Sequence, residues 1–129
     1  MNVSGTPSAP AFKNRGFRAR LGCALAGIRT VARREKSFRS QSLFAAAAAA
    51  ALCLLRPGLV WAALVIVSIG LVLALEMANA ALEYLADRLH PGFAEEIGRA
   101  KDAAAGAVLL ASIAAALVGT AMIACAFTD

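Results

Sequence analysis

The sequence predicts an all-α integral membrane protein with an N-terminal amphipathic surface helix and three transmembrane helices. Three observations predict this class. Of the 129 residues, 60% are hydrophobic and the mean hydropathy is +0.71, which is far from the composition of a soluble globular domain. Three long apolar stretches follow one another, separated by short polar segments. Nine of the thirteen Lys and Arg residues lie within the first 42 positions, as in proteins that contact an anionic membrane surface.

The N-terminal part of the chain predicts two segments. Residues 1–16 are expected to form a disordered basic tail. They lack the compact basic, apolar and cleavage regions of a secretory signal, so no processing is expected. Residues 17–34 are expected to form an amphipathic helix at the lipid surface, whose arginines can reach the headgroups. Its apolar face consists of residues at helical spacing: Phe17, Leu21, Ala24, Leu25, Ile28 and Ala32. Residues 17–129 together are expected to form one membrane domain.

The rest of the chain predicts three membrane-spanning helices. Their expected limits are about residues 40–55, 59–85 and 103–127. The sequence Arg56-Pro57-Gly58 is a turn signal that ends the first span. A polar loop is expected over residues 90–98, which contain Pro91-Gly92 and two glutamates.

The distribution of charge predicts how the helices cross the membrane. The N-terminal region is strongly basic, whereas the short connection after the first span carries only Arg56. Basic segments remain in the cytoplasm, so the N-terminus and the second loop are expected there, and the C-terminus outside. The net charge of +5 indicates an anionic membrane surface as the partner, and nucleic acid is not expected.

A stripe of polar residues interrupts the second apolar stretch. Its members are spaced i, i+3, i+7 and i+11: Glu76, Asn79, Glu83 and Asp87. This spacing places them on one side of a helix. Carboxylates at the end of a membrane helix are costly unless they line a polar site. The predicted topology also brings Glu35, Lys101 and Asp102 to the same membrane face.

These residue types together predict a phosphoryl-transfer site. Carboxylates and phosphate oxygens are the ligands that Mg²⁺ prefers, and a lysine such as Lys101 attracts phosphate. A further carboxylate can accept the proton of an attacking hydroxyl. Catalysis in such a site consists largely of positioning and charge neutralisation. The nucleotide-binding loops GxxxxGK[ST] and GxGxxG are absent from the sequence.

Other interpretations stay open from the residues alone. Asp87 and Glu95 fit solvated or ion-paired residues at helix ends, and Asn79 fits an amide that packs membrane helices together. The stripe also fits a small proton- or cation-translocating subunit, or a purely structural membrane subunit. A translocation pathway should distribute polar residues through the bilayer, whereas these residues gather at one face. That placement favours an enzyme.

Several motifs resemble the prokaryotic diacylglycerol kinase family, which includes the undecaprenol kinases. The family pattern is E-x-x-N-x-x-[IL]-E, an Asp four residues later, and [GK]RAKD after a polar loop. This sequence carries the pattern in residues 76–83, 87–88 and 98–102. Upstream, residues 24–29 resemble the surface helix of the family, and residues 35–39 resemble its E-x-x-F-R motif. The resemblance extends from about residue 17 to residue 127.

The resemblance implies a lipid kinase of the bacterial inner membrane that works as a homotrimer with sites shared between subunits. Its N-terminus would lie in the cytoplasm. Such an enzyme uses ATP with Mg²⁺ to phosphorylate the hydroxyl of a membrane lipid. The expected acceptor is diacylglycerol, which gives phosphatidic acid, and the alternative acceptor is undecaprenol.

The same resemblance implies roles for individual residues. Glu76 would be the general base, and Glu35 and Glu83 would hold the metal. The residues expected at the ATP site are Cys23, Glu35, Glu83, Lys101 and Asp102. The residues expected to organise the site and the lipid are Phe38, Arg39, Glu76 and Asn79.

Four residues depart from the family pattern. Gln41 stands where diacylglycerol kinases of the enterobacterial type carry Glu and undecaprenol kinases commonly carry His. Phe93-Ala94 replaces a common Tyr-His pair, and Cys23 stands where Tyr is usual. These differences bear on recognition of the lipid and the adenine more than on phosphate transfer, so they leave the lipid acceptor open.

Overall fold

The computed structural model describes residues 16–92 and 94–128, and these form four α-helices with no strand among them. The helices are α1 (Phe17–Arg34), α2 (Lys36–Leu55), α3 (Leu59–Leu89) and α4 (Glu95–Ala126). The all-α prediction is therefore confirmed for this part of the chain. The tail expected at residues 1–16 lies almost entirely outside the described residues, as does Phe93.

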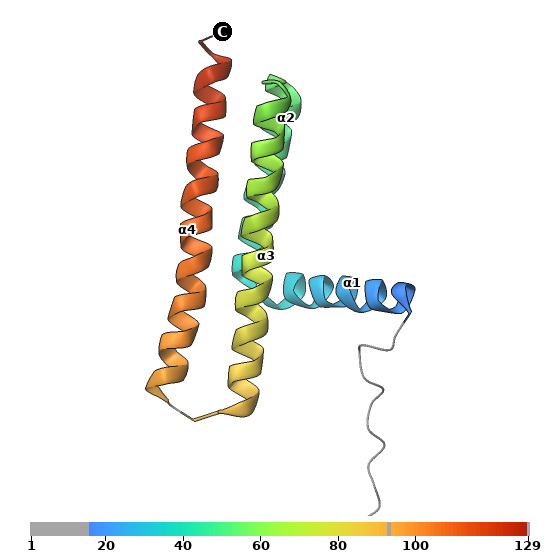
Figure 1. Cartoon of the computed structure of the whole chain (residues 1–129), viewed down its shortest axis with the longest axis vertical. Coiled ribbons are helices and arrows are strands. Elements are labelled where there is room, and N and C mark those ends of the chain that lie inside the picture. Colours follow the sequence, from blue (N-terminus) through green and yellow to red (C-terminus); the bar gives the residue numbers. More distant parts are fainter. Residues whose placement is uncertain (1–15, 93, 129) are drawn as a thin grey trace, which may run out of the picture.

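Helix α1 runs across the direction of the other three helices, which lie side by side (Figure 1). A single residue, Glu35, separates α1 from α2, and its extended backbone (φ −95°, ψ 118°) makes the corner. Its backbone N–H still donates to the carbonyl of Val31 at 2.8 Å, so the hydrogen-bond pattern of α1 continues up to the corner residue. Glu35 is thus held at the inner edge of the bend.

Helices α2, α3 and α4 are each long and apolar enough to cross a membrane. Helices α3 and α4 have 31 and 32 residues. At about 1.5 Å per residue such helices are roughly 46–48 Å long, against a hydrocarbon core of about 30 Å. Helices of this length are long enough for the polar C-terminal turns of α3 and the polar N-terminal turns of α4 to extend beyond the hydrocarbon region.

The connection between α3 and α4 is shorter than the loop expected over residues 90–98. It spans residues 90–94, because α4 already begins at Glu95. Glu95 and Glu96 occupy the first turn of α4, where negative charge is favoured by the helix dipole. The turn predicted at Arg56-Pro57-Gly58 is confirmed, and both Arg56 (φ 47°) and Gly58 (φ 94°) have left-handed backbone there.

Helix α3 packs against both α2 and α4, whereas α2 and α4 meet at few points. Most large apolar side chains of the bundle are exposed, as expected for surfaces that face lipid. A small core joins three helices where α1 meets the bundle: Val31, Phe38 and Ala80 are all buried in it. This arrangement leaves space between α2 and α4 over one face of α3, and the candidate site lies there.

Candidate functional site

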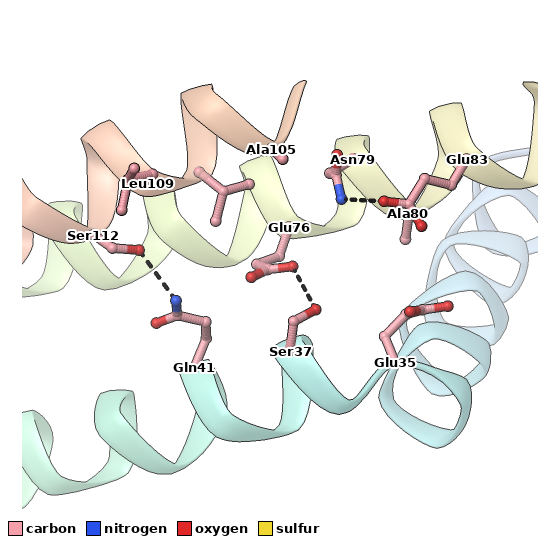
Figure 2. Close-up of a pocket in the computed structure, with 11 residues that line it drawn as sticks. Glu35, Ser37, Gln41, Glu76, Asn79, Ala80, Glu83, Ala105, Leu109 and Ser112 are labelled. Atoms are coloured by element: carbon pink, nitrogen blue, oxygen red, sulfur yellow. Dashed lines mark hydrogen bonds between the residues drawn. The ribbon is translucent and has the colours of Figure 1, made fainter. Parts of the chain in front are cut away.

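A polar pocket of about 420 Å³ lies between α2, α3 and α4 near the bend at Glu35 (Figure 2). Its polar lining residues are Glu35, Ser37, Gln41, Glu76, Asn79, Glu83 and Ser112. Four of these were predicted from the sequence as site residues: Glu35, Glu76, Asn79 and Glu83. The structure therefore brings together the stripe on α3 and the glutamate at the corner between α1 and α2.

Glu76 is the deepest charged group of the pocket. It is only 5% exposed and is the one buried charged residue among those described. Ser37 on α2 donates its hydroxyl to Glu76 Oε2 at 3.0 Å. Burying a carboxylate costs free energy unless hydrogen bonds compensate for the lost water. Within the described residues, the bond from Ser37 provides this compensation. The other oxygen, Oε1, is left available on the pocket side.

Asn79 and Glu83 form a second polar pair, one turn apart on α3. Asn79 Nδ2 donates to Glu83 Oε1 at 2.8 Å, which fixes the carboxylate against its own helix. Asn79 Oδ1 is buried and has no hydrogen-bond partner within the described residues. Buried polar atoms are nearly always hydrogen-bonded, so this oxygen is an exception within the polar pair.

Glu35 is held from α3 by a residue that sequence reasoning missed. The hydroxyl of Tyr84 donates to Glu35 Oε1 at 2.6 Å. Tyr84 directly follows Glu83, so one short segment of α3 supplies both a carboxylate and the group that orients its counterpart across the pocket. The signal for Tyr84 was weak: it is the only tyrosine of the chain and lies at the polar end of an apolar helix.

Gln41 and Ser112 close the pocket at the end away from Glu35 (Figure 2). Gln41 Nε2 donates to Ser112 Oγ at 3.1 Å, which joins α2 to α4. In the sequence, Gln41 stands out only as a departure from a family pattern, and Ser112 has no predicted role. Their proximity is invisible in the sequence because 71 positions separate them.

The other predicted site residues do not line this pocket. Phe38 is buried in the core with Val31 and Ala80, and Cys23 lies half-buried on α1. Arg39 is exposed and donates to the carbonyl of Arg33 at 2.9 Å. The roles assigned to these residues in ATP or lipid binding stay predictions.

Lys101 and Asp102 also lie outside the pocket of their own chain. Lys101 Nζ contacts Asp87 Oδ1 at 2.6 Å in an ion pair between α4 and α3, and Asp102 is exposed. This pairing agrees with the interpretation of Asp87 as a paired residue at a helix end. An exposed ion pair of this kind contributes roughly 0–1 kcal/mol, so it can be exchanged for a ligand at little cost.

The described residues contain no group of three or more His, Cys, Asp or Glu side chains that could hold a metal ion by themselves. Mg²⁺ usually takes one or two carboxylates, substrate phosphates and water. Glu35 and Glu83 each have one oxygen held by a donor and the other without a hydrogen-bond partner in the described part of the chain.

Comparison with known proteins decides the family. A family model described as prokaryotic diacylglycerol kinase matches residues 22–123, which include every residue of the pocket. The chain belongs to the prokaryotic diacylglycerol kinase family. The resemblance expected from the sequence motifs is therefore confirmed, and with it the class of enzyme: a lipid kinase that transfers phosphate to an alcohol group. The family is one of bacterial membrane proteins.

Individual relatives agree with the family match. The chain is 33% identical over 96 residues to the diacylglycerol kinase of Escherichia coli strain K12, covering 74% of this chain and 79% of that protein. The diacylglycerol kinase of Shigella flexneri gives the same values. The diacylglycerol kinase of Synechocystis is 37% identical over 97 residues, covering 74% of this chain and 55% of that longer protein.

Proposed function

We propose that this protein transfers the γ-phosphate of ATP, bound with Mg²⁺, to the hydroxyl of diacylglycerol in the membrane and so forms phosphatidic acid. Undecaprenol is the alternative acceptor. One observation carries the proposal: a buried carboxylate, Glu76, lies in a polar pocket between helices that are long and apolar enough to cross a membrane. A lipid hydroxyl can reach such a carboxylate from the bilayer, and ATP can reach the same pocket from water.

The chemistry requires a proton acceptor and a means of neutralising phosphate charge. The lipid oxygen bonds to the γ-phosphorus while the bond from that phosphorus to the bridging oxygen of ADP breaks. The hydroxyl proton passes to Glu76 Oε1, the oxygen that Ser37 leaves unbound. Ser37 holds the Glu76 carboxylate in place while this carboxylate acts as the general base.

Glu35 and Glu83 are proposed to hold the Mg²⁺ that arrives with ATP, which neutralises phosphate charge when bound. Support comes from the donors that orient the two carboxylates: Tyr84 on Glu35 and Asn79 on Glu83. Metal-binding carboxylates are commonly oriented by such neighbouring donors.

The protein is further proposed to work as a homotrimer in the bacterial inner membrane, with its N-terminus in the cytoplasm and α1 on the membrane surface. Several residues expected at the ATP site, including Lys101 and Asp102, lie outside the pocket of their own chain. A neighbouring subunit that supplied them would complete the site. Extensive exposed apolar surface on α2, α3 and α4 is available for such contacts and for lipid.

The proposal is tested with purified protein in lipid–detergent micelles, given radiolabelled ATP and either diacylglycerol or undecaprenol. We expect label to enter diacylglycerol, only when Mg²⁺ is present. Faster labelling of undecaprenol would make that lipid the acceptor instead. If neither lipid is labelled at any Mg²⁺ concentration, the proposed function is wrong. Crosslinking or mass measurement in the same micelles tests the trimer separately.

A further inference from the structure

A second cavity of about 480 Å³ lies between the same three helices, further along the bundle than the polar pocket. Its lining is mostly apolar and includes Phe44 and Ala48 on α2, Val65 and Val72 on α3, and Ile123 on α4. Both cavities fall within the range of about 300–1,000 Å³ that is typical of small-molecule sites. A lipid whose hydroxyl lay in the polar pocket would extend its hydrocarbon in this direction.

Two residues, Gln41 and Ser112, line both cavities. Their hydrogen bond of 3.1 Å therefore lies at the border between the carboxylates and the apolar space. Gln41 is one helical turn from Ser37, which holds Glu76, and four residues rise about 6 Å along a helix. The pair is thus about one turn further from the phosphate end than the general base.

The pair has unused hydrogen-bonding capacity. Ser112 Oγ accepts from Gln41, and no acceptor for its own hydroxyl hydrogen is found in the described part of the chain. An amide nitrogen carries two hydrogens, and one of those on Gln41 Nε2 is engaged. The amide oxygen of Gln41 turns away from Ser112 (Figure 2). Both side chains are half-buried. A ligand that forms hydrogen bonds with them therefore binds more tightly, and a ligand that buries them without hydrogen bonds binds more weakly.

We propose that Gln41 and Ser112 are specificity-determining residues that donate hydrogen bonds to an ester carbonyl of the acceptor lipid and so favour an acylglycerol over a polyprenol. The inference rests on the proposed function and names the feature of the substrate that this site reads. In a diacylglycerol an ester carbonyl lies only a few bonds from the free hydroxyl, which matches the one-turn step from Ser37 to Gln41. A polyprenol has hydrocarbon at that place.

The chemistry of the pair agrees with this choice. Both groups are neutral, so they can bind a neutral carbonyl without the desolvation of a charge that a carboxylate or a protonated imidazole at position 41 would require. A site built to hydrogen-bond a substrate group rejects an analogue that lacks it, because the site's polar groups are then buried unpaired. The expected discrimination therefore lies between lipids with and without the carbonyl.

The test compares three acceptors in the same mixed micelles: diacylglycerol, its dialkyl ether analogue and undecaprenol. The ether analogue keeps the chains and the hydroxyl but has no carbonyl. We expect the unmodified protein to phosphorylate the ester with a kcat/KM about 5- to 150-fold above that of the ether, the range for two hydrogen bonds. Ser112→Ala and Gln41→Leu should lower the ester value towards the ether value. The values for the ether and for undecaprenol should stay the same or rise, because the polar groups that those lipids bury unpaired have been removed.

Two further variants separate specificity from structure. Ser112→Thr keeps the hydroxyl and should retain the preference for the ester. Ser42→Ala removes a neighbouring hydroxyl that bonds to the carbonyl of Phe38 on its own helix at 2.8 Å and lines neither cavity, so it should change nothing. Equal use of ester and ether by the unmodified protein would overturn the inference and leave the kinase standing. Equal loss for all three lipids in Ser112→Ala would also overturn it. If no lipid is labelled at all, the proposed function itself is wrong, and the inference that rests on it is wrong as well.

Discussion

The polar pocket and the apolar cavity lie between the same three helices, yet their linings differ sharply. Three glutamates and an asparagine line the first, whereas alanine and larger aliphatic side chains dominate the second. The change falls on α3 between Val72, which lines the apolar cavity, and Glu76, one turn later. Position along one continuous helix therefore separates the place for phosphate chemistry from the place for hydrocarbon. No change of fold is needed to achieve this.

Glu76→Gln tests the catalytic role of the polar pocket and should have the largest effect on turnover. The amide keeps the size of the side chain but cannot take a proton, so we expect kcat to fall by about 10²–10⁴-fold, the range for a positioned general base. The KM for ATP should change little because the nucleotide is bound elsewhere in the pocket. Both values come from initial rates with labelled ATP. Near-full turnover in Glu76→Gln would show that the base has been assigned wrongly.

Glu83→Gln is expected to have the next largest effect. Removing this charge takes away a proposed Mg²⁺ ligand, so turnover should fall by at least about 100-fold and the remaining rate should need more Mg²⁺. Gel filtration in detergent should show the same assembly as for the unmodified protein. The matched control is Glu96→Gln, an exposed glutamate in the first turn of α4. An equal loss in the control would argue against a specific role for Glu83.

Tyr84→Phe also changes the polar pocket and should have a smaller effect on turnover. It removes only the hydroxyl that bonds to Glu35 Oε1 at 2.6 Å. Loss of a group that orients a metal ligand costs about 10–100-fold in metal affinity or activity, and we expect a value near the lower limit. A Mg²⁺ titration of the rate should show a higher half-saturating concentration. An unchanged titration would mean that Glu35 does not bind the metal.

The smallest effect is expected in the apolar cavity. Ala48→Leu adds bulk to its lining, and an overpacking cost of about 1 kcal/mol would raise the KM for a long-chain lipid about fivefold. The KM for ATP should stay the same. Ala49→Leu places the same side chain on an exposed position of α2 that does not line the cavity, and serves as the control. If both variants behave alike, the cavity does not hold the lipid chain.

Much of the site was predictable because its residues are close in sequence. Glu76, Asn79 and Glu83 share one face of a helix by their spacing alone, and a helix of this hydropathy has no stable alternative in a membrane. The motif on α3 also predicted the family, which the family match confirms. The end of the second loop was predicted less well, because polar residues such as Glu95 are favoured in the first turn of a helix as well as in a loop.

The sequence by itself determined the four helices, the turn at Pro57 and the polar stripe, because each depends on residues within one or two turns of each other. Only the tertiary structure decided which groups meet across helices. Ser37 reaches Glu76 over 39 positions, Tyr84 reaches Glu35 over 49, and Gln41 reaches Ser112 over 71. These contacts depend on how helices pack and on the bend at Glu35, and periodicity along a single helix carries no information about which neighbour its polar face will meet.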